Sequence, residues 1–299
     1  MTPTDANTTL AEPAAPLRLG CVGYLNTLPL IEGLGKLRDL RLTLTAPARL
    51  SDLLQAGDID MGLLSTIDYQ RLSTPDSRTN AIPGGLCMIP VGMIGCDGPT
   101  LTVRLFSAVP WPDVTRLHAD IDSHTSVALA RIILAERFGV RPEIVEFDTE
   151  LTHANRANHA DSPQSMLLIG DKVVTNTPTP ERYPYQLDLG EAWKALTGLP
   201  FVYAVWMCPA HRADDPRITA VSAVLDRQRR HNATRASWII QQRAEVRGWR
   251  TDLAHHYTND LLRFNVEEEH RRAVETFFDA AQRHAIIKSR VPTRWLDFA

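Results

Sequence analysis

The sequence has few of the features that mark secreted or metal-stabilised proteins. Only four cysteines occur in 299 residues. They lie far apart in apolar segments and show no Cys-x-x-Cys spacing: Cys21, Cys87, Cys96 and Cys208. This distribution favours neither a disulfide framework nor a zinc site. We therefore expect free thiols and a reducing, cytoplasmic compartment.

The chain also lacks segments that would direct it to or through a membrane. Residues 1–16, MTPTDANTTLAEPAAP, contain no basic stretch followed by an apolar one, so we expect no secretory signal peptide there. Their Ala, Pro and Thr content predicts a disordered lead-in. No uninterrupted apolar stretch reaches the length needed to cross a bilayer.

A net basic charge is missing as well. The chain has 32 Lys and Arg against 35 Asp and Glu, a formal net charge of −3 and a pI near 6.4. No overall field attracts nucleic acid or an anionic membrane. Residues 227–250 are rich in arginine, but Trp238, Ile239 and Ile240 among the arginines indicate a helix with a core face. We predict neither nucleic acid nor membrane as a partner, and the pattern favours no oligomeric state.

Most conventional catalytic motifs are absent. There is no Gly-x-Gly-x-x-Gly after a strand, no Walker A loop, no His-Glu-x-x-His and no Gly-x-Ser-x-Gly. His255 and His256 are neighbours on a predicted helix and cannot both face one metal ion. The charged run at residues 267–272 is typical of an exposed helix face. We therefore predict no organic cofactor and no metal.

Alternating strand and helix patterns are present along most of the chain. They form two series and are followed, after residue 214, by charged helical segments, which predicts an α/β fold with two lobes and a helical C-terminal segment. No flexible linker separates the series, so we expect paired crossover strands, with RLFSAV and FVYAVW as candidates. The predicted domains are lobe 1 at residues 17–107, completed by 202–299, and lobe 2 at residues 108–201.

Polar side chains follow two of the predicted strands. Asn26 and Thr27 come directly after the first strand, and Ser65 and Thr66 follow IDMGLL in the same way. In α/β proteins the carboxyl ends of parallel strands border the ligand crevice. A third polar group, Ser123, Thr125 and Ser126, lies at the predicted start of a helix, where hydroxyls and unpaired N–H groups attract anions. Together these residues predict a crevice with neutral donors for a small polyanion.

Six stretches carry a family resemblance: VGYLNTLPL, AGDIDMGLLSTIDYQ, GCDGPTLTVRLFS, DSHTSVALARIIL, LLIGDKVV and DLGEAWKALTGLPFVYAVW. In this order, from about Leu17 to Trp206, the chain resembles the chorismate dehydratases of the futalosine route to menaquinone. The most specific parts are Tyr-Leu-Asn-Thr near the amino end and the block from Trp193 to Trp206. The helical C-terminal segment is consistent with the family but less diagnostic.

The resemblance implies a fold like the type II periplasmic solute-binding proteins, used here as a cytoplasmic enzyme. The implied reaction removes water from chorismate to give 3-[(1-carboxyvinyl)oxy]benzoate. Such an enzyme is a carbon–oxygen lyase that uses neither a metal nor an organic cofactor. The absence of cofactor motifs agrees with this expectation.

The resemblance and the polar positions together give a candidate site. We expect Asn26 to be catalytic, by hydrogen bonding near the carbon atoms where elimination occurs. The substrate's own enolpyruvyl carboxylate would accept the ring proton. The candidate substrate-binding residues are Tyr24, Thr27, Ser65, Thr66, Cys96, Asp97, Gly98, Ser123, Thr125, Ser126 and Asp171.

One loop departs from the family pattern. Where the family commonly has Ser-Ser or Ser-Ala before a Gly-Pro pair, this chain has Gly95-Cys96-Asp97. A serine hydroxyl would then be replaced by the Cys96 thiol or a backbone N–H. Asp97 is either a general acid or, as is more usual beside Gly-Pro, a turn former.

Two other functions remain open. One is the later enzyme of the same pathway, which acts on cyclic dehypoxanthine futalosine and shares the fold; the Tyr-Leu-Asn-Thr motif argues against it. The other is a non-catalytic solute-binding or sensing protein. A solute-binding protein would normally be exported, so the expected lack of a signal peptide argues against that alternative.

Overall fold

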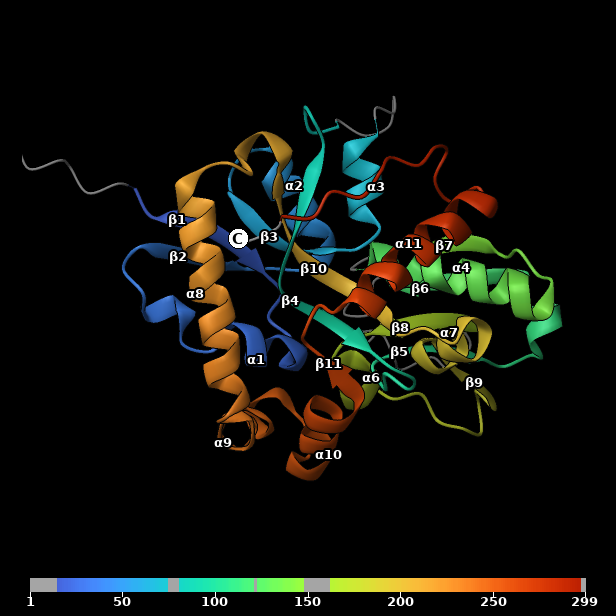
Figure 1. The fold of residues 1–299 in the computed structure, drawn as a ribbon. Coiled ribbons are helices and arrows are strands. Elements are labelled where there is room, and N and C mark those ends of the chain that lie inside the picture. The colour runs from blue at the N-terminus through green and yellow to red at the C-terminus, as the bar shows by residue number, and fades with distance from the viewer. Residues whose placement is uncertain (1–14, 75–80, 121–122, 148–161, 297–299) are drawn as a thin grey trace, which may run out of the picture.

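A computed structural model describes residues 15–74, 81–120, 123–147 and 162–296. Nearly all of the predicted lead-in, and Asp122 in the predicted turn before the third polar group, lie outside the described residues. The described chain folds around two mixed β-sheets that lie side by side and carry helices on their faces (Figure 1). The predicted α/β class is therefore confirmed.

The first sheet has six strands in the order β11-β4-β10-β3-β1-β2. Strand β1 is parallel to β2 and β3, whereas β10 runs antiparallel to both β3 and β4. We call the half of the molecule around this sheet lobe 1. Its strands are β1 (Leu17–Cys21), β2 (Leu40–Leu44), β3 (Met61–Ser65), β4 (Leu86–Cys96), β10 (Phe201–Pro209) and β11 (Leu262–Arg263).

The second sheet, around which lobe 2 is built, has five strands in the order β7-β6-β8-β5-β9. Its strands are β5 (Val103–Ser107), β6 (Arg116–Asp120), β7 (Glu143–Phe147), β8 (Ser165–Ile169) and β9 (Tyr185–Asp188). The prediction that lobe 1 extends to residue 107 is wrong for β5, because this strand pairs with β8 and β9. The chain enters the second sheet between Cys96 and Val103 and re-enters the first at Phe201.

The helices cover the faces of both sheets (Figure 1). In lobe 1, α2 begins at Pro47, and the Ser51 hydroxyl in its middle donates to the carbonyl of Ala48. Proline suits a first helical turn because its missing N–H is not needed there. The helices are α1 (Leu28–Ile31), α2 (Pro47–Gln55), α3 (Asp68–Ser73), α4 (His124–Phe138), α6 (Lys172–Thr175), α7 (Leu189–Thr197), α8 (Pro216–Ala233), α9 (Ala236–Arg243), α10 (Thr251–His256) and α11 (Glu268–Arg283).

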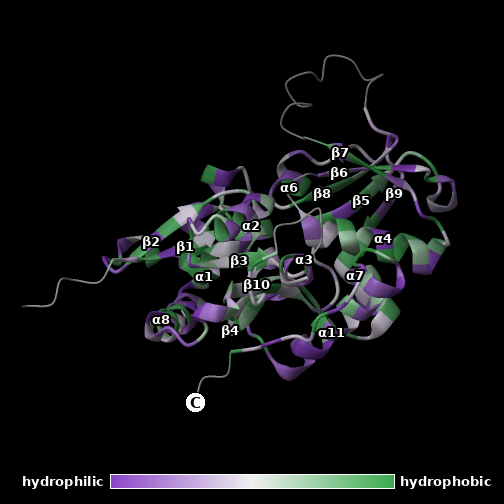
Figure 2. Cartoon of the chain, turned by 90° about the horizontal axis from the view of Figure 1, so that it is seen from above, coloured by the Kyte–Doolittle hydropathy of each residue, from purple (hydrophilic) through white to green (hydrophobic). Residues whose placement is uncertain are grey.

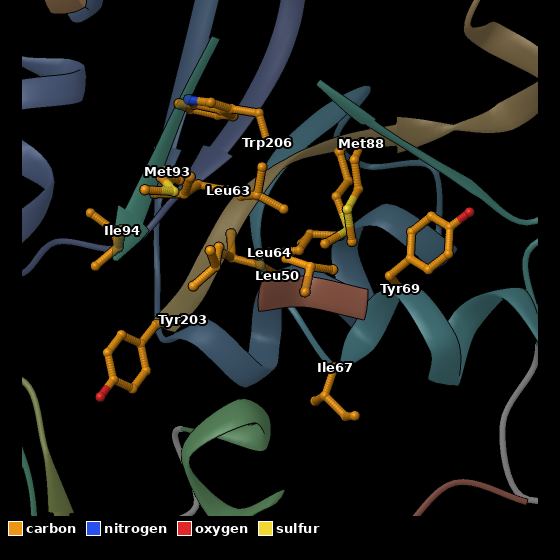
Figure 3. Close-up of a cluster of buried hydrophobic side chains, with 14 of the residues drawn as sticks. Leu50, Leu63, Leu64, Ile67, Tyr69, Met88, Met93, Ile94, Tyr203 and Trp206 are labelled. Atoms are coloured by element: carbon orange, nitrogen blue, oxygen red, sulfur yellow. The ribbon is translucent and has the colours of Figure 1, made fainter. Parts of the chain in front are cut away.

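The core lies where the long strands β4 and β10 pair. Figure 3 shows Met88, Met93 and Trp206 packed with Leu63 and Leu64, all of them almost completely buried. Figure 2 shows hydrophobic residues on α4, and Leu129, Ile132 and Ile133 of this helix are completely buried. Among the described residues, no helix combines the length and apolar character needed to cross a membrane.

Candidate functional site

A cavity of about 70 Å³ lies where the two sheets meet. Residues from both sheets, from the start of α4 and from the C-terminal segment line it. None of the described lining residues carries a charge. They are Val22, Tyr24, Asn26, Pro47, Leu63, Ser65, Ile94, Thr100, Thr102, Val103, Ser123, Ser126, Ile169, Gly170, Tyr203, Ala204 and Tyr257.

Asn26 enters this cavity from a single 3₁₀ turn, Leu25–Thr27, that follows β1. The neighbouring Thr27 is fully buried, and its Oγ1 lies 2.9 Å from the Val22 carbonyl and 2.8 Å from the Tyr24 carbonyl. These hydrogen bonds fix the turn. The Oδ1 atom of Asn26 is buried and has no hydrogen-bond partner. An unpaired buried acceptor is costly, so this atom is a strong candidate for contact with a ligand.

The first turn of α4 forms the opposite wall. Ser123 caps this helix, because its Oγ accepts a hydrogen bond from the Ser126 N–H at 3.1 Å. Both residues line the cavity together with Ser65 from the end of β3. The positive end of a fifteen-residue helix dipole therefore borders a neutral, hydroxyl-lined space, as the sequence predicted.

Several lining residues were missed by the sequence analysis. Thr102, just before β5, lies 2.6 Å from the hydroxyl of Tyr257, and burial raises the pKa of this tyrosine. Tyr257 begins a π-helical turn, Tyr257–Leu261, a local irregularity that is frequent at functional sites. Tyr203 of β10 contributes a second buried phenol. Nothing in the sequence signalled Tyr257, whereas Tyr203 lay within the specific block from Trp193 to Trp206.

The loop that carries Thr100 is held by one carboxylate. Asp188 is buried and accepts hydrogen bonds from the N–H groups of Thr100 at 3.0 Å and Leu101 at 2.7 Å. The same side chain caps α7 by accepting from the N–H groups of Gly190 and Glu191. Leu101 has a φ of +65°, a conformation that is strained for a leucine. Two of these four hydrogen bonds hold the strained loop against the cavity, and the other two tie it, through the same carboxylate, to α7.

Besides Thr27, three predicted binding residues have buried side chains that do not line the cavity. The hydroxyl of Thr66 donates to the Val202 carbonyl at 2.7 Å, and that of Thr125 accepts from the Ile67 N–H at 3.1 Å. Cys96 is fully buried, and burial raises the pKa of its thiol to about 12. A thiol with that pKa stays protonated at neutral pH and is a poor nucleophile.

Three further predicted residues lie outside the cavity lining. Asp97 is more than one-third exposed and pairs with Lys194 at 2.5 Å. Gly98 has a φ of +117°, which serves the turn that the sequence analysis gave as the alternative for this loop. The carboxylate of Asp171 accepts from the Leu25 N–H at 3.3 Å, and burial raises its pKa.

The cavity is narrow because the lobes touch each other around it. The Asp171–Leu25 and Thr125–Ile67 hydrogen bonds each join lobe 2 to lobe 1. Gly170 lets the lobes approach further, since a Cβ there would lie 3.0 Å from the Tyr24 ring. The described contacts therefore correspond to a closed arrangement of the two lobes.

Two larger cavities, each of about 530 Å³, occur elsewhere. One lies between α3, α4 and residues 286–289 and is lined by Arg71, Arg131 and Lys288. The other lies beside Asp60, whose carboxylate is already paired with Arg18 and Arg212. Neither contains the strand-end residues that point to a site. We therefore take the smaller cavity as the candidate site.

One group of described residues has metal-binding side chains close together: Glu267, Glu269 and His270. It lies at the start of α11, with both glutamates exposed. The Nδ1 atom of His270 accepts from the Glu267 N–H at 3.2 Å, and the Glu267 side chain in turn caps the helix. This reciprocal arrangement is a helix cap and explains the grouping without a metal.

Comparisons with known proteins show which family the chain belongs to. Residues 17–283 match the model of a family described as menaquinone biosynthesis. A chorismate dehydratase of Thermus thermophilus is 30% identical over 280 residues, which cover 89% of this chain and 95% of that protein.

Solved structures with low sequence identity share the fold. An Archaeoglobus fulgidus protein matches with a TM-score of 0.67 at 14% identity, covering 92% of this chain and 100% of the other. The alkanesulfonate-binding protein of Xanthomonas axonopodis pv. citri, bound to MOPS, matches with a TM-score of 0.66 at 17% identity, covering 94% and 97%. A Candida albicans protein with the periplasmic binding protein fold matches with a TM-score of 0.64 at 11% identity, covering 92% of each chain. The chain therefore belongs to the menaquinone biosynthesis family and has a periplasmic-binding-protein-like fold.

Proposed function

We propose that this protein is a chorismate dehydratase that forms 3-[(1-carboxyvinyl)oxy]benzoate in the futalosine route to menaquinone, in the cytoplasm. The family and the dehydratase relative support this proposal. The observation that carries it is the buried, unpartnered Oδ1 of Asn26 at a neutral cavity bordered by hydroxyls and the start of α4.

The neutral lining suits a substrate that brings its own charges. Chorismate carries two carboxylates, and the hydroxyls of Ser65, Ser123 and Ser126 offer hydrogen bonds without a fixed counter-charge. Apart from the N–H of Ser126, which donates to the Ser123 Oγ, the first-turn N–H groups of α4 have no helical acceptors and add donors of the same kind. The proposed carboxylate contacts exclude Thr27, Thr66 and Thr125, because their hydroxyls already serve the fold.

The proposed chemistry is a loss of water driven by aromatisation of the ring. The proton on the ether-bearing ring carbon passes to the enolpyruvyl carboxylate of the substrate. The electron pair of that C–H bond forms the new ring double bond, and the neighbouring C–O bond breaks. The departing hydroxide takes up a proton and leaves as water. No net oxidation occurs, so the reaction needs no redox cofactor.

Asn26 is proposed to act on the substrate at the eliminating carbons. Its Oδ1 accepts and its Nδ2 donates, so the amide can orient the hydroxyl that leaves. The Thr102–Tyr257 hydroxyl pair lies on the same cavity, and burial keeps Tyr257 protonated. Holding the reacting groups in line supplies much of the rate in such a reaction.

Substrate entry requires the lobes to separate. The cavity of about 70 Å³ is far below the roughly 300–1,000 Å³ of typical small-molecule sites. The Asp171–Leu25 and Thr125–Ile67 contacts would open for entry and re-form around the bound substrate. Closure of this kind excludes water from the reacting groups.

The test is incubation of the purified protein with chorismate, with separation of the products by chromatography and mass measurement. We expect 3-[(1-carboxyvinyl)oxy]benzoate, without added metal. Chorismate that raises the melting temperature but is recovered unchanged would indicate a non-catalytic binding protein. Turnover of cyclic dehypoxanthine futalosine in a parallel reaction, with chorismate untouched, would indicate the later enzyme of the pathway.

A further inference from the structure

The hydroxyl of Tyr203 is a buried polar group that the ligand-free protein leaves unused. Tyr203 comes from β10, is 8% exposed and lines the candidate cavity. Its OH makes no hydrogen bond of normal geometry, and it interacts only weakly with the side chains of Thr100 and Cys96 beside it. Figure 3 shows the ring at the margin of the hydrophobic cluster with its oxygen directed away from Leu63, Leu64 and Ile94.

Burying the Tyr203 hydroxyl without a good hydrogen bond costs free energy, and the packing of the ring does not require the hydroxyl. The ring packs edge-on against Phe201, with centroids 4.7 Å apart, and a phenylalanine at position 203 would keep that contact. A buried donor without an acceptor loses its hydrogen bonds to water and gains nothing in return. Buried polar atoms of this kind call for a specific explanation, and contact with a substrate is one.

The surroundings of the hydroxyl define which ligand group would meet it. Burial raises the pKa of Tyr203 well above 10, and the nearby Cys96 and Asp188 add to this shift. The phenol is therefore a neutral donor at physiological pH. Because none of the described lining residues is cationic, the site would hold a ligand carboxylate with neutral O–H and N–H donors.

We propose that Tyr203 is a substrate-binding residue whose hydroxyl donates a hydrogen bond to a carboxylate oxygen of the substrate. This inference rests on the proposed function, since it assigns one more contact in the same cavity. It makes Tyr203 a determinant of specificity, because an analogue without that carboxylate would leave the phenol unpaired in the complex.

The test is the substitution Tyr203→Phe, which removes one oxygen and keeps the ring. We expect kcat/KM for chorismate to fall about ten- to a hundredfold, the usual range for a lost hydrogen bond to a charged group. We expect the melting temperature of the ligand-free protein to stay the same or rise, because the unpaired hydroxyl is gone. Loss of activity together with retained or increased stability is a signature that a purely structural tyrosine does not give.

Tyr69→Phe is the matched control. The Tyr69 hydroxyl donates to the Pro292 carbonyl at 2.8 Å and accepts from the Arg294 N–H at 2.7 Å, away from the cavity. Its removal leaves two partners unsatisfied, so we expect a lower melting temperature and an unchanged kcat/KM. The two variants should therefore change the two measurements in opposite ways.

Two results would overturn the inference. One is a kcat/KM of Tyr203→Phe within twofold of the wild type. The other is a fall in its ligand-free melting temperature comparable to that of Tyr69→Phe. If the wild type forms no product from chorismate, the proposed function fails, and the melting temperatures without ligand still decide whether the Tyr203 hydroxyl is unpaired.

Discussion

Two cavities share a wall at Ser123 and differ in almost every other respect. The larger, of about 530 Å³, has an excess of basic residues in its described lining, with Arg71, Arg131 and Lys288 against Asp120 and Glu146, and we call it the basic cavity. The smaller, of about 70 Å³, has a neutral described lining with the unpartnered atoms of Asn26 and Tyr203. Size and positive charge would favour the basic cavity for an anionic substrate. Unpaired buried polar atoms favour the neutral one, whose described lining has two of them, against one, the Oγ1 atom of Thr74, in that of the larger cavity.

The comparison teaches that buried polar groups without a hydrogen-bond partner in the protein indicate a candidate site better than the size or the charge of a cavity does. Beside the basic cavity the Asp68 carboxylate lies 2.8 Å from Arg71 and 2.8 Å from the His124 ring, so the charge of Arg71 is already balanced within the protein. In the neutral cavity the unpartnered polar atoms point to a ligand that would complete them. Four predictions, in order of decreasing effect, test this difference.

Replacing Asn26 should have the largest effect. We expect Asn26→Ala to lower kcat by about a hundredfold or more and KM by little, because the amide acts mainly on the reacting groups. Steady-state kinetics with chorismate measures both constants. Equal losses in binding and turnover would contradict a role in the chemical step.

Asn232→Ala serves as the control for that substitution. Asn232 is buried, its Nδ2 donates to the Glu32 carbonyl at 3.0 Å and its Oδ1 accepts from Gln228 at 3.0 Å. Both functions of the amide are used within the fold. We therefore expect this variant to lose stability and to keep its turnover per folded molecule.

Replacing Asp188, which anchors the loop at Thr100 and Leu101, should have a smaller effect that lowers both stability and activity. Asp188→Asn replaces a carboxylate that accepts four N–H bonds by an amide with one oxygen, so we expect a loss of about 1.5–3 kcal/mol in the free energy of unfolding. Because the freed loop carries Thr100 and Thr102, kcat/KM should also fall about tenfold. Urea unfolding and kinetics measure the two effects.

Asp215→Asn is the control for Asp188→Asn, because it removes a helix-capping carboxylate that does not hold the loop beside the cavity. Asp215 caps α8 by accepting from the Arg217 N–H at 2.9 Å, and it lies outside the cavity. Its substitution should lower stability without changing kcat/KM. If Asp188→Asn behaved in the same way, the loop would not need its anchor for activity.

The sequence predicted the cavity residues that directly follow a strand or begin a helix. Asn26, Ser65, Ser123 and Ser126 lie at such positions, where local patterns determine the structure. Their neighbours Thr27, Thr66 and Thr125 were predicted for the same surface, but the structure places them outside the cavity lining. Thr27 turns inward because the Leu25–Thr27 turn needs its hydroxyl, and a one-residue difference of this kind is invisible in a pattern.

The remaining cavity residues could not be found from the sequence because tertiary contacts bring them there. Tyr203 reaches the site only because β10 lies between β3 and β4 in the first sheet. Tyr257 comes from the C-terminal segment and meets Thr102, which is 155 positions away in sequence. Non-local pairings of this kind leave no periodic trace in either segment.

The pH dependence of activity should be weak. None of the described lining residues is acidic, basic or a histidine, and burial raises the pKa of Tyr203 and Tyr257. A raised pKa keeps both phenols protonated as pH rises, so they lose their protons only above the measured range. We expect kcat/KM to vary less than about threefold between pH 6 and 9. An inflection near pH 6.5 would contradict this expectation, because histidine is the side chain that ordinarily titrates there and none lines the described part of the cavity.

The smallest effect should come from the basic cavity itself. Arg131 lines it, and burial together with nearby Arg141 lowers the pKa of Arg131, because both disfavour the charged guanidinium. An anionic ligand bound there would stabilise that charge. If chorismate reacted in this cavity, Arg131→Gln would raise KM about tenfold or more. If it reacts in the neutral cavity, kcat/KM should stay within about twofold. Steady-state kinetics beside Tyr203→Phe therefore compares the two cavities directly, and a larger loss from Arg131→Gln would reverse their assignment.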